Sequence, residues 1–155
     1  MHGRPYLRHT RYGWVPAGIL LVGACGTEPN PEVGGTWSLT SSFAGGDVAC
    51  TVEALLTLTT DAEDLTGTLI EEQATCTSAG ESIEVATQSH PIVGELDGDG
   101  ISFTAQVDEG GGGCAVMVFE GRASASAMSG QLETRSVFCQ GTFVRMHGTW
   151  QAERR

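Results

Sequence analysis

The chain has 155 residues, with 19 Asp and Glu against eight Lys and Arg, and a formal net charge of −11 at pH 7. Binding to nucleic-acid phosphates needs a basic surface, so we expect no nucleic-acid partner. The length is sufficient for one domain with its own core.

The first 24 residues have the layout of an export signal. Arg4, Arg8 and Arg11 precede an apolar run from Trp14 to Ala24. A membrane-spanning helix needs about 20 residues, so this run is too short to be a stable span. A basic start, a short apolar segment and small residues at its end are typical of a secretory signal peptide. Removal of residues 1–24 leaves five Arg against 19 acidic residues, a charge of −14.

The end of this signal carries a more specific motif. Val22-Gly23-Ala24-Cys25 resembles the lipobox of bacterial lipoproteins. The resemblance implies that the peptide is cut before Cys25, which is acylated and holds the protein to a membrane of the cell envelope. Gly26 follows in place of Asp, which favours the outer membrane in a host with two membranes. The alternative is an ordinary cleaved signal with a coincidental cysteine.

After Cys25, the residues up to 34 are rich in Pro, Gly and acid, and we predict a flexible tether over 25–34. The rest, 35–155, shows short apolar or alternating runs separated by turn residues, which indicates an all-β domain. The segment "ISFTAQVD" at 101–108 alternates with period two, as expected of a strand with one buried face. The predicted strands are 35–43, 49–60, 65–77, 82–97, 101–108, 114–123, 128–138 and 141–152.

Every connection between these strands is short, so sequence neighbours should pair antiparallel. An open meander would leave two unpaired edges, and closure removes them. We therefore predict a single eight-stranded up-and-down barrel, with a two-sheet β-sandwich as the alternative. The first and last strands should pair, with Trp37 and Trp150 at the same end of the barrel. Pro91 should cause a bend or bulge in strand 82–97.

Four cysteines follow Cys25, and an even number in an exported chain indicates disulfides. Cys50 and Cys76 lie symmetrically about the predicted turn at 61–64, and Cys114 and Cys139 about the one at 124–128. Directly opposed residues of a hairpin are within disulfide range. We predict the pairs Cys50–Cys76 and Cys114–Cys139 over the two other pairings. The spacings do not match a zinc site or a redox motif.

Other motifs have simpler structural explanations. Glu95, Asp97 and Asp99 resemble the start of a calcium loop, but Gln106 stands where the closing Glu should be, so a tight turn is preferred. "EGGGGC" lacks the Lys and the helix of a phosphate-binding loop. His90 and His147 fall on separate strands, without a nucleophile motif nearby. We expect no enzyme activity, no metal and no cofactor.

Gly35-Thr36-Trp37 opens the first strand, and Gly148-Thr149-Trp150 recurs on the last. The first triplet resembles the Gly-x-Trp that begins the lipocalin barrel, where the Trp closes one end. The resemblance implies an Arg from late in the chain across that ring, here Arg145 or Arg154. Avidin-like barrels share the strand number, but their Trp- and Tyr-rich biotin pocket has no counterpart here.

Two functions are consistent with these features. The first is a lipocalin-like carrier of a small apolar molecule, since eight strands leave either a filled interior or room for one small ligand. The inward candidates for its wall are Leu56, Leu58, Leu69, Phe103, Met117 and Phe119. The second is a protein-binding envelope module, similar to the periplasmic inhibitors of lysozyme, with a basic hydrolase as its partner. The volume of the barrel interior discriminates between them.

Overall fold

The computed structural model describes residues 30–107, 115–136 and 145–155, and these ranges form an all-β domain. Within them, no helix is long and apolar enough to cross a membrane. The strands found in these ranges are β1 (Gly35–Gly45), β2 (Val48–Asp61), β3 (Asp64–Ser78), β4 (Glu81–Glu84), β5 (Ser89–Asp97), β6 (Gly100–Val107), β7 (Ala115–Ala123), β8 (Ala127–Ser136) and β9 (His147–Arg154).

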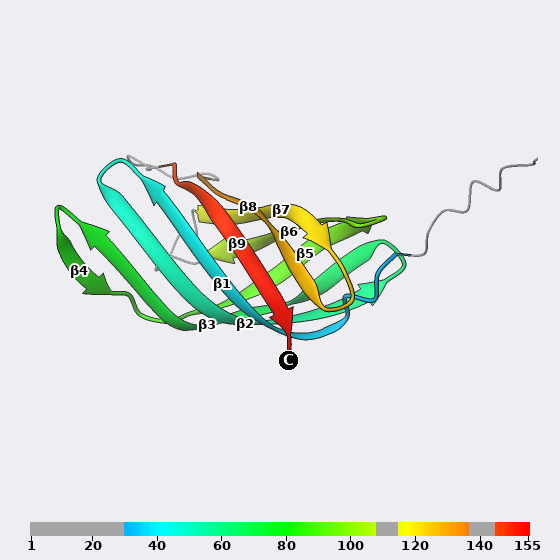
Figure 1. Ribbon diagram of the computed structural model, residues 1–155. Helices are drawn as coiled ribbons and strands as arrows, with labels where there is room; N and C mark the ends of the chain where they lie inside the picture. The colour runs from blue at the N-terminus through cyan, green and yellow to red at the C-terminus, as the bar shows by residue number, and fades with distance from the viewer. Residues whose placement is uncertain (1–29, 108–114, 137–144) are drawn as a thin grey trace, which may run out of the picture.

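Eight of these strands form a closed antiparallel barrel, as the sequence predicts. β1 pairs with β2 on one side and with β9 on the other, and the remaining neighbours complete the ring through β3, β5, β6, β7 and β8. The short strand β4 adds to the sheet beside β3. The pairing of β1 with β9 excludes the open sandwich (Figure 1).

The two tryptophans do not lie at the same level, which corrects one expectation. Trp37 pairs with Arg154, whereas Trp150 pairs with Ser41, four residues further along β1. Trp37 therefore lies near the end of the barrel and Trp150 lies deeper inside it. The two strands do run start against end, but β9 continues beyond Trp150 to Arg154.

The predicted strand 82–97 is two strands, β4 and β5, with residues 85–88 between them outside any strand. The predicted irregularity is therefore present, but it precedes Pro91. Pro91 itself lies within β5, opposite Thr68 of β3. The irregularity in the neighbouring strand is a β-bulge in β3, where the register shifts between Glu53 and Ala54 of β2.

The barrel has two distinct ends. The base holds the β2–β3 turn at 61–64, the β5–β6 turn at 97–100 and the β7–β8 turn at 123–127, together with residues 30–34 and the C-terminus. The mouth holds the β1–β2 turn at 45–48 and the β3–β4 turn at 78–81. Figure 1 shows the β3–β4 hairpin at the mouth and the label C near the base.

Glycines allow the strands to approach closely where the wall of the barrel bends. Gly121 of β7 pairs with Gly130 of β8. A Cβ at Gly130 would lie 1.9 Å from the carbonyl oxygen of Glu120, so any side chain there would push β8 away from β7. Glycine within a strand often marks such a close approach of two backbones.

The disulfide Cys50–Cys76 is present and joins β2 to β3 near the mouth, with an S–S distance of 2.02 Å. The two residues pair directly across the hairpin, which confirms the symmetry argument. The predicted pair Cys114–Cys139 lies outside the described residues.

Candidate functional site

The interior of the barrel differs between its two halves, and the base half is packed with large apolar side chains. Phe103 and Phe119 stack with their ring centroids 4.6 Å apart, and both meet Trp150 edge-on at 5.4 and 5.8 Å. The large apolar side chains around this cluster are each 2% exposed or less. They are Trp37, Leu39, Leu56, Leu58, Leu65, Leu69, Ile92, Leu96, Ile101, Leu132 and Met128.

On the mouth side of this cluster several strands carry a small or polar residue inward, and apolar residues such as Phe43 and Val52 follow nearer the rim. Toward the mouth, the next inward residue beyond Leu39 on β1 is Ser41, and the next one beyond Leu56 on β2 is Ala54. Other inward residues of this kind are Glu71 on β3, His90 on β5, Ala105 on β6 and Thr134 on β8. The buried polar residues found in the described ranges, Ser41, His90 and Thr134, all belong to this half.

The six residues that the sequence suggested as a ligand wall fall into both halves of the barrel. Leu56, Leu58, Leu69, Phe103 and Phe119 are all buried and all belong to the packed base half. Met117 lies closer to the mouth and is 6% exposed. Whether any of the six contacts a ligand stays a prediction, and the first five are each 2% exposed or less.

Glu71 is the last inward residue of β3 before a β-bulge. Up to this point the inward positions of β3 are odd-numbered, such as Leu65 and Leu69, and after it they are even-numbered, beginning with Ala74. Ala54 faces Glu71 and Glu53 faces Gln73, so β3 carries one extra residue at this point. Bulges commonly re-aim a side chain in this way.

Pro91 explains the position of the His90 ring. The β5–β6 ladder ends at the pair Ile92 and Ala105, and the next residue pair would join Pro91 to Gln106. Because proline has no N–H, it cannot donate to the ladder. Nδ1 of His90 instead donates to the carbonyl oxygen of Gln106, at 2.9 Å.

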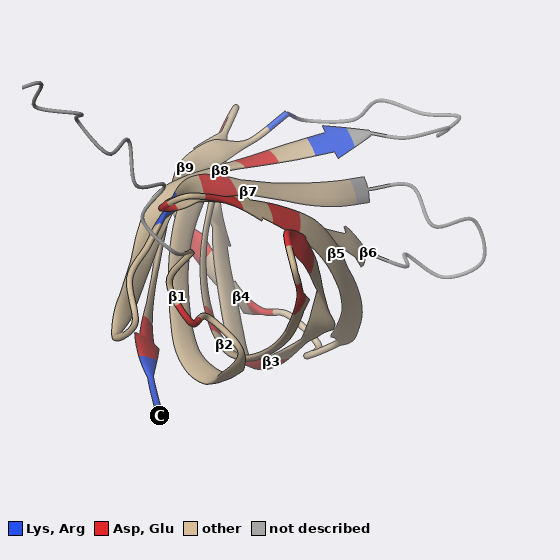
Figure 2. Ribbon diagram, turned by 90° about the vertical axis from the view of Figure 1, so that its right-hand side faces the viewer, with Lys and Arg blue, Asp and Glu red and all other residues tan. Residues whose placement is uncertain are grey.

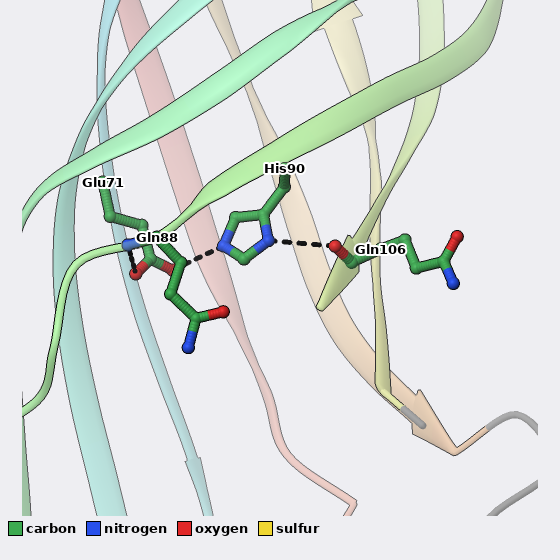
Figure 3. A network of polar contacts seen from close by, with 4 residues as sticks. All are labelled: Glu71, Gln88, His90 and Gln106. Atoms are coloured by element: carbon green, nitrogen blue, oxygen red, sulfur yellow. Dashed lines mark hydrogen bonds and ion pairs between the residues drawn. The ribbon is translucent and has the colours of Figure 1, made fainter. Parts of the chain in front are cut away.

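Glu71 and His90 form a buried polar network with their neighbours (Figure 3). Nε2 of His90 lies 3.1 Å from Oε1 of Glu71, and the side chains are 2% and 11% exposed. The backbone N–H of Gln88 donates to Oε2 of Glu71 at 3.2 Å. The network therefore joins β3, β5, β6 and the connection that precedes β5.

The sequence analysis did not select Glu71 and His90 as site residues. The alternation in "SHPIVGEL" already places His90 on the same face as Ile92 and Leu96, so a buried histidine could have been found. Glu71 could also have been found, because it continues the odd-numbered alternation of Leu65 and Leu69 on β3.

The base is closed by a contact that the lipocalin resemblance implies. The guanidinium of Arg154 lies 4.5 Å from the ring centroid of Trp37. Arg154 also donates to the carbonyl oxygens of Glu32, Gly34 and Ala125. Arg145, the other candidate, contacts Glu133 on the outer face instead.

The outer surface is acidic, and Figure 2 shows acidic residues on strands around the barrel. At the base, Asp64 and Glu95 pair directly across β3 and β5. On β8, a hydrogen bond from Arg135 lowers the pKa of Glu133, with further attraction from Arg145 and His147.

A hollow lined by described residues also lies on the outside, with about 490 Å³. Its wall comes from β1, β8 and β9. The side chains are exposed, polar and uncharged: Thr40, Ser42, Ser129, Gln131, Thr149 and Gln151.

Comparison with known proteins adds no relative to this picture. No protein-family model matches the chain, and neither a curated protein nor a solved structure matches it. The site must therefore be interpreted from its own geometry.

Proposed function

We propose that this chain is an exported, lipid-anchored, lipocalin-like barrel that binds one small ligand with a largely apolar body in the mouth half of its interior. The observation that carries the proposal is the group of small and polar inward residues on the mouth side of the aromatic cluster, which includes Ser41, His90 and Thr134. Eight-stranded barrels with a filled interior have no need for such a group. Ligand sites are mostly apolar, with a few placed polar groups that fix orientation.

The residues of the mouth half fit this description. Ala54, Ala105 and Met117 offer apolar surface, while Ser41 and Thr134 offer hydroxyl groups. The charges of Glu71 and His90 are directed at each other, so the wall presents no unpaired charge from these two residues. A compact molecule without a net charge is the class of ligand that such a wall favours.

Ligand binding is tested with a neutral fluorescent probe, N-phenyl-1-naphthylamine, and the variant Ser41→Leu. The added side chain would occupy the mouth half, so we expect probe affinity to fall by at least about tenfold, or about 1.4 kcal/mol. Ser42→Leu is the matched control, because Ser42 is the next residue and faces outward. Equal binding by the wild type and both variants would show that the probe does not occupy the interior, whereas unfolding of Ser41→Leu would show that this half has no spare room.

The proposed location rests on Cys25 and on the disulfide. A disulfide is typical of compartments outside the reducing cytosol. The chain enters the domain at the base, where Asn30 accepts a hydrogen bond from Gly98 and Val33 is fully buried. An acyl group on Cys25 would therefore hold the base toward the membrane, the outer one in a host with two, and leave the mouth open to the surroundings.

Lipidation is tested by metabolic labelling with a fatty-acid probe in a bacterium that has a lipoprotein pathway. We expect label on the wild type and none on Cys25→Ala, with Cys25→Ala released from the membrane fraction. Equal labelling of the two proteins would contradict the anchor, and the ligand proposal would stand without it.

A basic protein partner is the second candidate. The direct opposition of Asp64 and Glu95 at the base favours it, because like charges at paired positions are destabilising unless something neutralises them. An anchored base faces the membrane, however, which leaves little room for a protein there. Inhibition of a basic hydrolase is the assay to run if no probe binds to the interior.

A further inference from the structure

We propose that Glu71 and His90 form a proton-dependent latch, which holds the mouth of the barrel together when protonated and releases it when the proton is lost. The latch would regulate access to the ligand site, and only this consequence rests on the proposed function. The network itself can be tested without a ligand.

The hydrogen bonds fix how many protons the pair holds. A carbonyl oxygen can only accept, so Nδ1 of His90 must carry a hydrogen to bind Gln106. The contact between Nε2 and Oε1 of Glu71 then needs one more proton, on either atom. The N–H of Gln88 donates to Oε2 of Glu71, so this oxygen acts as an acceptor. The consistent state is an imidazolium paired with a carboxylate.

Loss of this proton leaves two acceptors facing each other. Neutral His90 keeps its hydrogen on Nδ1, so the lone pair of Nε2 points at the carboxylate of Glu71. Two hydrogen-bond acceptors 3.1 Å apart repel. The side chain of His90 is 2% exposed, whereas that of Glu71 is 11% exposed and so already reaches solvent. Glu71 is therefore the residue that moves.

Movement of Glu71 would release the segments that the network joins. Its Oε2 holds the N–H of Gln88, so the connection at 85–88 loses one of its ties to β3. Two backbone hydrogen bonds also tie this connection to β3. The N–H of Glu71 donates to the carbonyl oxygen of Gln88, and the N–H of Val85 donates to the carbonyl oxygen of Ala74. The 85–88 connection leads directly into β5, which places the effect at the mouth and not at the base.

The other described groups around the pair do not titrate near neutral pH. Inward neighbours on the facing strands are Ser41 of β1, Ala54 of β2, Ala105 of β6, Met117 of β7 and Thr134 of β8. Among described residues, Glu71 is the ionisable side chain whose contact with His90 is recorded. Histidine is the side chain that ordinarily changes charge between about pH 5 and 8.

The direction of the pH effect follows from proton linkage. The closed state holds a proton that the open state releases, so acid favours closure and the latch opens as the pH rises. A ligand that enters from the mouth should then exchange faster at alkaline pH.

The experiment follows the backbone amide of Gln88 by NMR-detected hydrogen exchange, at about pH 5 and about pH 8, corrected for the intrinsic rate. In the wild type we expect the protection of Gln88 to fall by about tenfold or more at the higher pH. The amide of Leu96, which donates to the carbonyl of Glu63 at the base, is the internal control and should not change.

Two variants identify the groups responsible. In Glu71→Gln the amide can donate to Nε2 of neutral His90 and accept from Gln88, so the protection of Gln88 should not depend on pH. His147→Gln removes an exposed histidine and should keep the wild-type pH dependence. Equal protection in the wild type at both pH values, or a pH-dependent loss that persists in Glu71→Gln, overturns the latch.

The neutral probe separates this inference from the proposed function. If Gln88 shows the expected change but no probe binds at either pH, the latch stands and the ligand function fails. If the probe binds at both pH values while Gln88 does not respond, the ligand function stands and the latch is wrong. We expect both to hold, with the dissociation rate of the probe rising with pH in the wild type and not in Glu71→Gln.

Discussion

The base half and the mouth half of the barrel are built on the same strands, yet their interiors follow different rules. The base half contains the aromatic cluster of Phe103, Phe119 and Trp150 and is almost entirely apolar. The mouth half contains the polar network of Glu71 and His90 beside small side chains. The difference teaches that burial alone does not identify what a position contributes, because Leu39 and Ser41 are equally buried, at 2% and 3%.

Apolar burial explains why the base half should supply most of the stability. A large aromatic side chain removes roughly 150–250 Å² from water, and each Å² is worth roughly 25 cal/mol. Buried polar groups contribute less, since they exchange hydrogen bonds with water for hydrogen bonds within the protein. The mouth half also needs the Cys50–Cys76 disulfide, where β2 and β3 extend beyond the contact with β5.

The sharpest test of this comparison uses two neighbouring inward residues of β1. Leu39→Ala should destabilise the protein by about 2–5 kcal/mol, because the packed base cannot collapse into the space left behind. Ser41→Ala should change the stability by less than about 1 kcal/mol, since it removes only one oxygen atom. Urea denaturation followed by tryptophan fluorescence measures both.

Similar losses in the two variants would break the comparison. A large loss in Ser41→Ala would show that the mouth half is packed as tightly as the base, and the proposed ligand site would lose its space. Thr40→Ala serves as the outward control on the same strand and should be near neutral.

The architecture could be predicted from the sequence because the signals were local and agreed with one another. Period-two alternation and short turns gave antiparallel hairpins, and edge protection then required β1 to pair with β9. The division of 82–97 into β4 and β5 could not be predicted in the same way. The interruption at 85–88 has no glycine or proline, and it depends on a bulge in β3 that only the pairing with β2 reveals.

The candidate site was harder to predict for a related physical reason. The sequence identified apolar inward residues correctly, but it could not tell those that fill the base from those near the mouth. That distinction depends on the tilt of the strands, which sets how high each inward residue lies in the barrel. His90 was not selected as a site residue, and the structure shows a buried ring with partners on two other strands.

The last prediction concerns the covalent link that is confined to the mouth half. Cys50 and Cys76 are 26 residues apart in sequence. In the chain-entropy treatment, closing a loop of this size raises the free energy of the unfolded chain by about 3 kcal/mol. The double variant Cys50→Ser/Cys76→Ser should therefore lose about that much stability.

The loss should also be local in its first effect. Without the link, hydrogen-exchange protection should fall first in the mouth-end parts of β2 and β3, at 48–52 and 74–78, while Leu56 and Leu69 at the centre stay protected until global unfolding. The two serines leave the rest of the chain unchanged, so any other cysteine pairing is unaffected. Protection lost first at the base would mean that the aromatic cluster is not the most stable part of the barrel. The expected order, with protection lost first at the mouth, would show that the base half holds the fold on its own. The mouth half could then open and close around a ligand while the base half stays folded.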